Sequence, residues 1–123
     1  MTFKLKRVYE AASARDGARV LVDRLWPRGV SKAKAGLAFW MKDVAPSPAL
    51  RVWFDHDPEK FTEFGRRYRK EIQGNPAVAE LRKLGQRKVV TLLYGAHDPA
   101  INHAVVLRAA LLRRSAAKRA PKK

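Results

Sequence analysis

Two polar segments each follow an apolar run that is typical of a buried β-strand. Residues 23–29 read Asp-Arg-Leu-Trp-Pro-Arg-Gly and follow the apolar run 20–22. Residues 95–103 read Gly-Ala-His-Asp-Pro-Ala-Ile-Asn-His and follow the run 89–94. In open α/β sheets, ligands bind outside the carboxyl ends of the strands. If the two runs are parallel strands of one sheet, both segments lie at the same edge and form one site.

Arg24 and Arg28 have the most specific chemistry in these segments. Two guanidinium groups within five residues, held by a neighbouring proline and glycine, can clamp a phosphate or a carboxylate through paired hydrogen bonds. The alternative is structural, with one of the two arginines forming an ion pair with Asp23 or Asp98. The sequence leaves both possibilities open.

Two histidines are candidates for moving a proton. Imidazole titrates near neutral pH, which makes His56 and His103 candidate acids or bases, and Asp23 can act as a base or orient a neighbour. The alternative is that these histidines are structural and that Asp57, which follows His56, only caps a helix. The other polar candidates at this edge are Tyr94, Asp98 and Asn102.

Several kinds of catalytic and cofactor site are disfavoured. There is no cysteine, which excludes disulfides, thiolate nucleophiles and Cys-type zinc sites. The three histidines do not have the spacing of a metal site, so no metal is expected. Neither a phosphate-binding Walker loop, a glycine-rich dinucleotide motif nor a Gly-x-Ser-x-Gly motif is present, and no cofactor is expected.

The elements that must position these residues are predicted from periodicity and capping. Strands are predicted at 3–9, 20–22 and 89–94, and residues 38–44 fit either a short strand or a helix start. Asx-Pro pairs predict helices that open at Asp57, Asn75 and Asp98, with Gly85 ending the second. A further short helix is predicted near Ser47. Buried strands separated by helices indicate a small single-domain α/β fold with a mostly parallel sheet flanked by helices.

The charge balance is strongly basic. The chain has 123 residues, with 27 Lys and Arg against 11 Asp and Glu, which gives a net charge of +16. Neither a secretory signal nor an apolar run long enough to span a membrane is evident, so we expect a soluble, cytoplasmic protein. We predict one domain at 1–114 and a basic disordered tail at 115–123, which either aids solubility or binds nucleic acid.

Long, ordered blocks of the chain resemble the YeaO-like family, domain of unknown function 488. The resemblance covers residues 3 to about 112 and implies a compact α/β domain of uncharacterised activity. It also implies that the polar residues of these blocks form a shared site, which adds Lys42 and Arg51 to the candidates. The blocks are Lys6–Tyr9, Asp16–Gly17, Arg19–Gly29, Trp40–Ser47, Leu50–Pro58, Phe64–Tyr68, Thr91–Asp98 and Asn102–Ala104.

Three hypotheses follow for the function. The first is a pocket for a phosphorylated or nucleotide-like anion, held by Arg24, Arg28 and Arg51, with Asp23 and Asn102 as positioning groups. His56 or His103 would carry a proton if the protein is an enzyme, which the sequence does not decide. The alternative is a non-enzymatic nucleic-acid-binding protein that uses its basic surface and tail. The third is a structural domain whose polar edge is an internal network of ion pairs.

Overall fold

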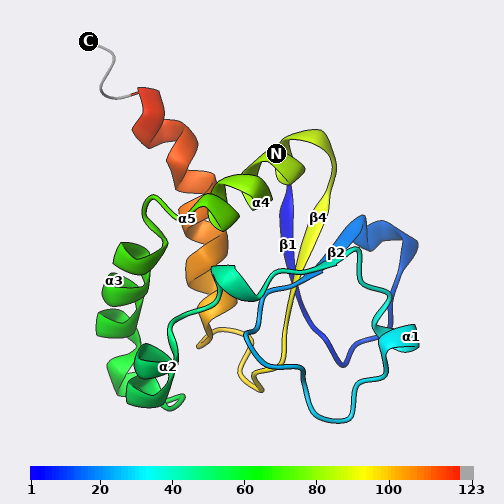
Figure 1. Ribbon diagram of the computed structural model, residues 1–123, viewed down its shortest axis with the longest axis horizontal. Coiled ribbons are helices and arrows are strands. Elements are labelled where there is room, and N and C mark those ends of the chain that lie inside the picture. Colours follow the sequence, from blue (N-terminus) through cyan, green and yellow to red (C-terminus); the bar gives the residue numbers. More distant parts are fainter. Residues whose placement is uncertain (120–123) are drawn as a thin grey trace.

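A four-stranded parallel sheet forms the centre of the molecule (Figure 1). The computed structural model describes the backbone of residues 1–119 and the side chains of residues 1–113. The strands have the spatial order β1-β4-β2-β3, so the last strand in the sequence pairs with both β1 and β2. This confirms the predicted α/β class and parallel sheet. The strands are β1 (Phe3–Arg7), β2 (Ala18–Leu21), β3 (Phe39–Trp40) and β4 (Val90–Tyr94).

Helices cover one face of the sheet and supply most of the core. Their apolar side chains pack with Phe3, Val20 and Leu92 of the sheet in one continuous cluster, as expected for a parallel sheet whose strands are buried on both faces. The helices of this layer are α2 (Pro48–Phe54), α3 (Phe61–Ile72), α4 (Pro76–Arg87) and α5 (His103–Arg119). A smaller apolar cluster that contains Leu21 and Leu93 lies on the opposite face, where the single-turn helix α1 (Lys32–Ala35) is also found.

The predicted helix starts are confirmed at three of four places. Ser47 caps α2 and Asn75 caps α4, each with proline in the first turn. Asp57 caps the short 3-10 turn η3 (Pro58–Lys60), which leads directly into α3. The prediction that a helix opens at Asp98 is wrong. The side chain of Asp98 accepts hydrogen bonds from the backbone N–H groups of residues 100 and 101 in a separate turn, and α5 begins only at His103.

The sequence predicts that Gly85 ends the second helix, but α4 continues to Arg87. The glycine lies against the sheet instead. A Cβ atom at this position would overlap the ring of Phe3. The absence of a side chain at Gly85 therefore allows α4 to pack directly on β1.

The structure of two further segments differs from a single predicted element or from the predicted tail. Residues 38–44 contain both β3 and the 3-10 turn η2 (Lys42–Val44).

At the other end of the chain, α5 continues to Arg119 and so enters the segment that is predicted to be a disordered tail. Ala116 and Ala117 favour helix, whereas Pro121 cannot continue one. Residues 120–123 lie outside the described residues, and the domain boundary at 114 stays a prediction.

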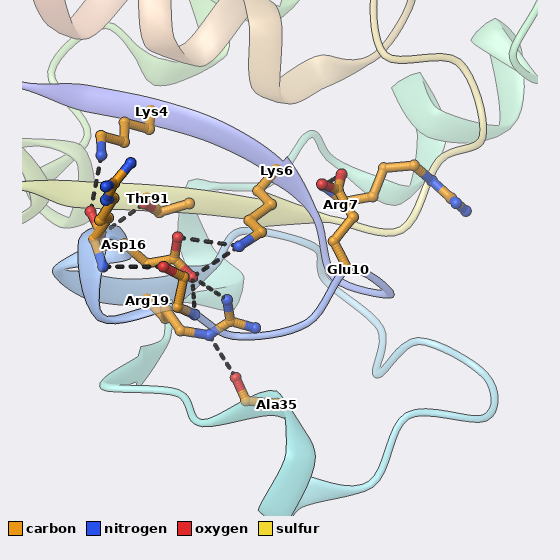
Figure 2. Close-up of polar contacts among 10 residues, drawn as sticks. Lys4, Lys6, Arg7, Glu10, Asp16, Arg19, Ala35 and Thr91 are labelled. Atoms are coloured by element: carbon orange, nitrogen blue, oxygen red, sulfur yellow. Dashed lines mark hydrogen bonds and ion pairs between the residues drawn. The ribbon is translucent and has the colours of Figure 1, made fainter.

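A cluster of buried charges lies on the face of the sheet opposite the helical layer (Figure 2). We call Lys6, Asp16 and Arg19 the buried charge cluster. The Asp16 carboxylate lies 2.6 Å from Nη1 of Arg19 and 3.1 Å from Nζ of Lys6. Burial alone would raise the pKa of Asp16, but hydrogen bonds from Arg19, from the N–H of Ser13 and from Lys6 outweigh it and lower the pKa. Arg19 also donates to the carbonyl of Ala35 and thereby ties α1 to the sheet.

Candidate functional site

A cavity of about 550 Å³ opens at the carboxyl ends of β2 and β4. We call it the edge cavity. The two polar segments singled out in the sequence meet here, since the backbone N–H of Gly95 donates to Oδ2 of Asp23 at 3.0 Å. Apolar side chains form much of its wall, including Trp26, Phe54 and Phe64. A volume of this size with a few polar groups among apolar ones is typical of a small-molecule site.

Asp23 and His103 form a polar pair in the lining of the cavity. Nε2 of His103 lies 3.0 Å from the carbonyl oxygen of Val22 and 3.2 Å from Oδ1 of Asp23. Because a carbonyl oxygen only accepts hydrogen bonds, Nε2 carries the hydrogen, and Nδ1 is the nitrogen left to accept or exchange a proton. Oδ1 of Asp23 is buried and, among the described residues, accepts no hydrogen bond, so its close polar contact is the one with His103. The contact with Asp23 therefore orients the imidazole ring.

Arg24 lines the same cavity and is anchored by backbone carbonyls. Its Nη2 donates to Ala45 O at 3.2 Å, and its Nε lies 3.3 Å from Pro46 O. Carbonyl groups hold the guanidinium in place without cancelling its charge. Within residues 1–113, neither Arg24 nor Arg28 forms an ion pair, so the predicted structural alternative with Asp23 or Asp98 is wrong for both.

Arg51 and His56 also line the cavity, and both are exposed to solvent. Arg51 belongs to α2, and His56 follows directly after the C-terminal cap of that helix at Asp55. Asp55 and His56 have φ angles of 47° and 55°, in the left-handed region that residues other than glycine seldom adopt. The His56 ring packs on Phe54 with 6.1 Å between ring centroids. Two consecutive strained residues thus turn the chain at the cavity.

Asn102 and Asp98 reach the cavity from the segment between β4 and α5. Asn102 is 1% exposed, and its side chain accepts from the N–H of Val105 and donates to the carbonyl of Asp98. Asn102 therefore performs the capping role that the sequence assigns to Asp98. This amide stabilises the start of α5 beside the cavity, with its own hydrogen bonds already made within the protein.

Three of the predicted site residues do not line the edge cavity. Arg28 is exposed, and its backbone carbonyl accepts from the Tyr9 hydroxyl. The Lys42 ammonium lies 4.5 Å from the ring centroid of Trp40. Tyr94 is buried in the sheet, and this burial raises the pKa of its hydroxyl. Seven of the predicted residues do line the cavity: Asp23, Arg24, Arg51, His56, Asp98, Asn102 and His103.

Other parts of the cavity were not anticipated from the sequence. The sequence does not predict that Phe54 and Phe64 line a cavity, nor that the carbonyls of Ala45 and Pro46 hold Arg24. Backbone acceptors leave no trace in residue types, so no sequence signal could have found them. In the part of the chain that the structure describes, no three His, Asp or Glu side chains gather as metal ligands. No described helix has the length and apolar character that a membrane span requires.

Comparisons with known proteins identify relatives along nearly the whole chain. The family model described as "Inactive DUF488-N3 subclade" matches residues 2–123. The uncharacterized protein Rv3073c of Mycobacterium tuberculosis is 49% identical over 104 residues, which are 85% of this chain and 88% of that protein. The uncharacterized protein YeaO of Escherichia coli is 39% identical over 108 residues, 87% of this chain and 94% of that protein. No solved structure matches the chain. The chain therefore belongs to the YeaO-like DUF488 family, as its sequence blocks indicate.

Proposed function

We propose that the edge cavity binds a small molecule with a phosphate or similar anionic group, as in a phosphorylated or nucleotide-like compound. The observation that carries this proposal is Arg24. Its guanidinium lines the cavity, is anchored by the carbonyls of residues 45 and 46, and has no carboxylate partner within residues 1–113. A fixed and uncompensated guanidinium is suited to phosphate, which it can bind through paired hydrogen bonds.

Arg51 provides a second positive charge, and the apolar wall accommodates the rest of the molecule. Trp26 and Phe54 offer aromatic surface that an apolar or planar group can cover. His103, oriented by Asp23, offers Nδ1 as a polar contact that can be donor or acceptor according to its protonation. The ligand class thus has an anionic end for the arginines and a less polar body.

The proposal concerns binding, and we assign no reaction to His56, His103 or Asp23. The matching family model describes its subclade as inactive, which supports a binding role over a catalytic one. The cavity gives no support to the alternative of nucleic-acid binding through the basic surface and tail. Nucleic-acid binding would require a basic surface outside the cavity.

Thermal denaturation of the full chain with a panel of phosphorylated compounds and their dephosphorylated counterparts tests this function. We expect at least one phosphorylated compound to raise the melting temperature, because a ligand at 100 times its Kd stabilises the native state by about 2.7 kcal/mol. Arg24→Gln should weaken the binding of that compound by about 10- to 100-fold, which is the loss of a charge-assisted hydrogen bond.

Arg28→Gln is the matched control, because it removes the same charge four positions away and outside the cavity. Its binding constant should equal that of the wild type within about twofold. If no compound stabilises the protein, or if Arg24→Gln binds as tightly as the wild type, the proposed function is wrong.

A further inference from the structure

A second hollow lies between α3, α4 and α5, and its lining shares no residue with the edge cavity. Its volume is about 620 Å³. Ile72 and Val78 contribute apolar surface, and the turn that joins α3 to α4 contributes Gln73. No acidic residue lines this part of the described surface. Its five cationic residues, which define the cationic groove, are Arg66, Arg69, Lys70, Arg82 and Arg113.

Most of this positive charge is not neutralised within the protein. Arg69, Lys70 and Arg113 form no ion pair with any described residue. Arg66 lies 2.6 Å from Glu63, an exposed pair whose attraction is weak in water. Arg82 is held by the carbonyl of Leu111 on α5. The groove therefore presents at least three uncompensated charges, two on α3 and one on α5.

The chain continues this positive charge beyond the groove. Residues 99–123 contain seven Lys and Arg and no Asp or Glu. Arg113 lies on α5, which continues to Arg119 and projects past α3 and α4 (Figure 1). Positive charge spread along a helix beyond a groove complements an extended polyanion better than a compact one.

The residues of the groove indicate which polyanion it fits. Proteins that bind single-stranded nucleic acid stack its bases on aromatic side chains. No aromatic residue is present in the described lining of the groove. Arginine and lysine neutralise the phosphates of a duplex without reading its bases, and an amide such as Gln73 can donate to a phosphate oxygen. We propose that the cationic groove binds the phosphate backbone of double-stranded nucleic acid without sequence preference.

Fluorescence anisotropy of a labelled short duplex, measured with the full chain between about 50 and 200 mM salt, tests this site. The informative variant combines Arg69→Gln, Lys70→Gln and Arg113→Gln. We expect it to bind the duplex at least about tenfold more weakly at low salt. The plot of log K against log salt has a negative slope, and its magnitude should decrease by roughly 2 to 3, since each lost phosphate contact removes about 0.9 from it.

A control variant with the same net charge separates a groove from overall basicity. It combines Arg28→Gln, Lys32→Gln and Lys34→Gln, which are exposed and lie outside the groove. All these substitutions are on the surface, and circular dichroism verifies that both variants are folded. The control should bind the duplex within about threefold of the wild type.

Three results would overturn the proposal. One is equal weakening by the two triple variants, which would mean that binding follows net charge and the C-terminal segment alone. Another is tighter binding of a single strand than of a duplex of the same sequence. The third is groove-dependent binding to anionic lipid vesicles or an acidic peptide with no binding to the duplex. Because the cavity variant Arg24→Gln leaves the groove intact, failure of the proposed anion site does not affect this test.

Discussion

The buried charge cluster and the edge cavity both place an arginine beside the same small parallel sheet, with opposite outcomes. Arg19 is 4% exposed and lies against the carboxylate of Asp16. Arg24 lines an open cavity, and among the described residues its guanidinium donates hydrogen bonds only to backbone carbonyls. The first guanidinium has its counter-charge within the fold. The second is positioned by the fold while its charge remains available to a ligand.

This difference separates a structural arginine from a binding one. Burying a charge is costly unless it is paired, so a paired and buried arginine indicates a role in holding segments together. Arg19 meets this description, because it joins η1 (Ala14–Asp16), β2 and α1. Arg24 shows the reverse combination, with a firm anchor and no carboxylate, which is the arrangement expected where a ligand supplies the negative charge.

The largest effect is expected from breaking the closed cluster. Asp16→Ala leaves the buried Arg19 and the partly buried Lys6 without their carboxylate and should lower the free energy of unfolding by about 3 to 5 kcal/mol. Urea denaturation measures this loss. Ligand binding by the folded fraction should be unchanged. A loss below about 1 kcal/mol would mean that the cluster does not stabilise the fold.

A smaller effect is expected from acid. The pKa of Asp16 is lowered in the folded state, so its contribution to stability is present above about pH 3.9, the ordinary value for Asp, and is lost as the pH falls through the folded pKa. Glu63, whose pKa is lowered to about 2, acts in the same direction.

Salt separates these two contributions, since exposed pairs are screened and buried ones much less so. We expect the free energy of unfolding to decline less below pH 4 in Asp16→Asn than in the wild type. At high salt, Glu63→Gln should leave this decline unchanged. Urea denaturation as a function of pH measures both. An unchanged acid dependence in Asp16→Asn would contradict the assignment to Asp16.

The smallest effect is expected from Arg51. This residue also lines the cavity, but it is exposed, so its attraction for an anion is screened by water. Arg51→Gln should weaken binding of the stabilising compound by about two- to fivefold, less than Arg24→Gln. Isothermal titration of both variants, with Lys34→Gln as an exposed control, measures the order. If Arg51→Gln weakens binding more than Arg24→Gln does, the anion binds closer to α2 than we propose.

The sequence predicted the sheet, because apolar runs indicate buried strands. It also predicted the edge at which the cavity lies, because the carboxyl ends of parallel strands meet at one edge of a sheet. It also predicted that Asp23 and His103 lie at the same edge of the sheet. Arg28 was grouped with Arg24 by spacing alone. Arg28 is followed by Gly29, whose φ angle is 78°, and residue spacing alone does not predict how such a turn directs a side chain.

Other errors arose where one residue type serves two structures. An Asx-Pro pair can begin a helix or close a separate turn, and Asp98 does the second. A glycine can end a helix or allow a close contact, and Gly85 does the second. The buried charge cluster is not predicted, because an Asp-Gly pair such as Asp16-Gly17 indicates a turn and says nothing about burial. Its partner Lys6 is ten residues away, and the contact between them exists only in the folded chain.

The strand order has a consequence for how the chain acquires its structure. Strand β4 lies between β1 and β2 and, among the described strands, is the only one that pairs with β1. In the register of this pair Phe3 lies opposite Val90, so β1 has no neighbour in the sheet until β4 is in place. Contacts this distant along the chain are slow to form. A growing polypeptide that has not yet reached Tyr94 leaves both early strands with open edges, vulnerable to pairing with other molecules. The sheet therefore cannot assemble until β4 has been made.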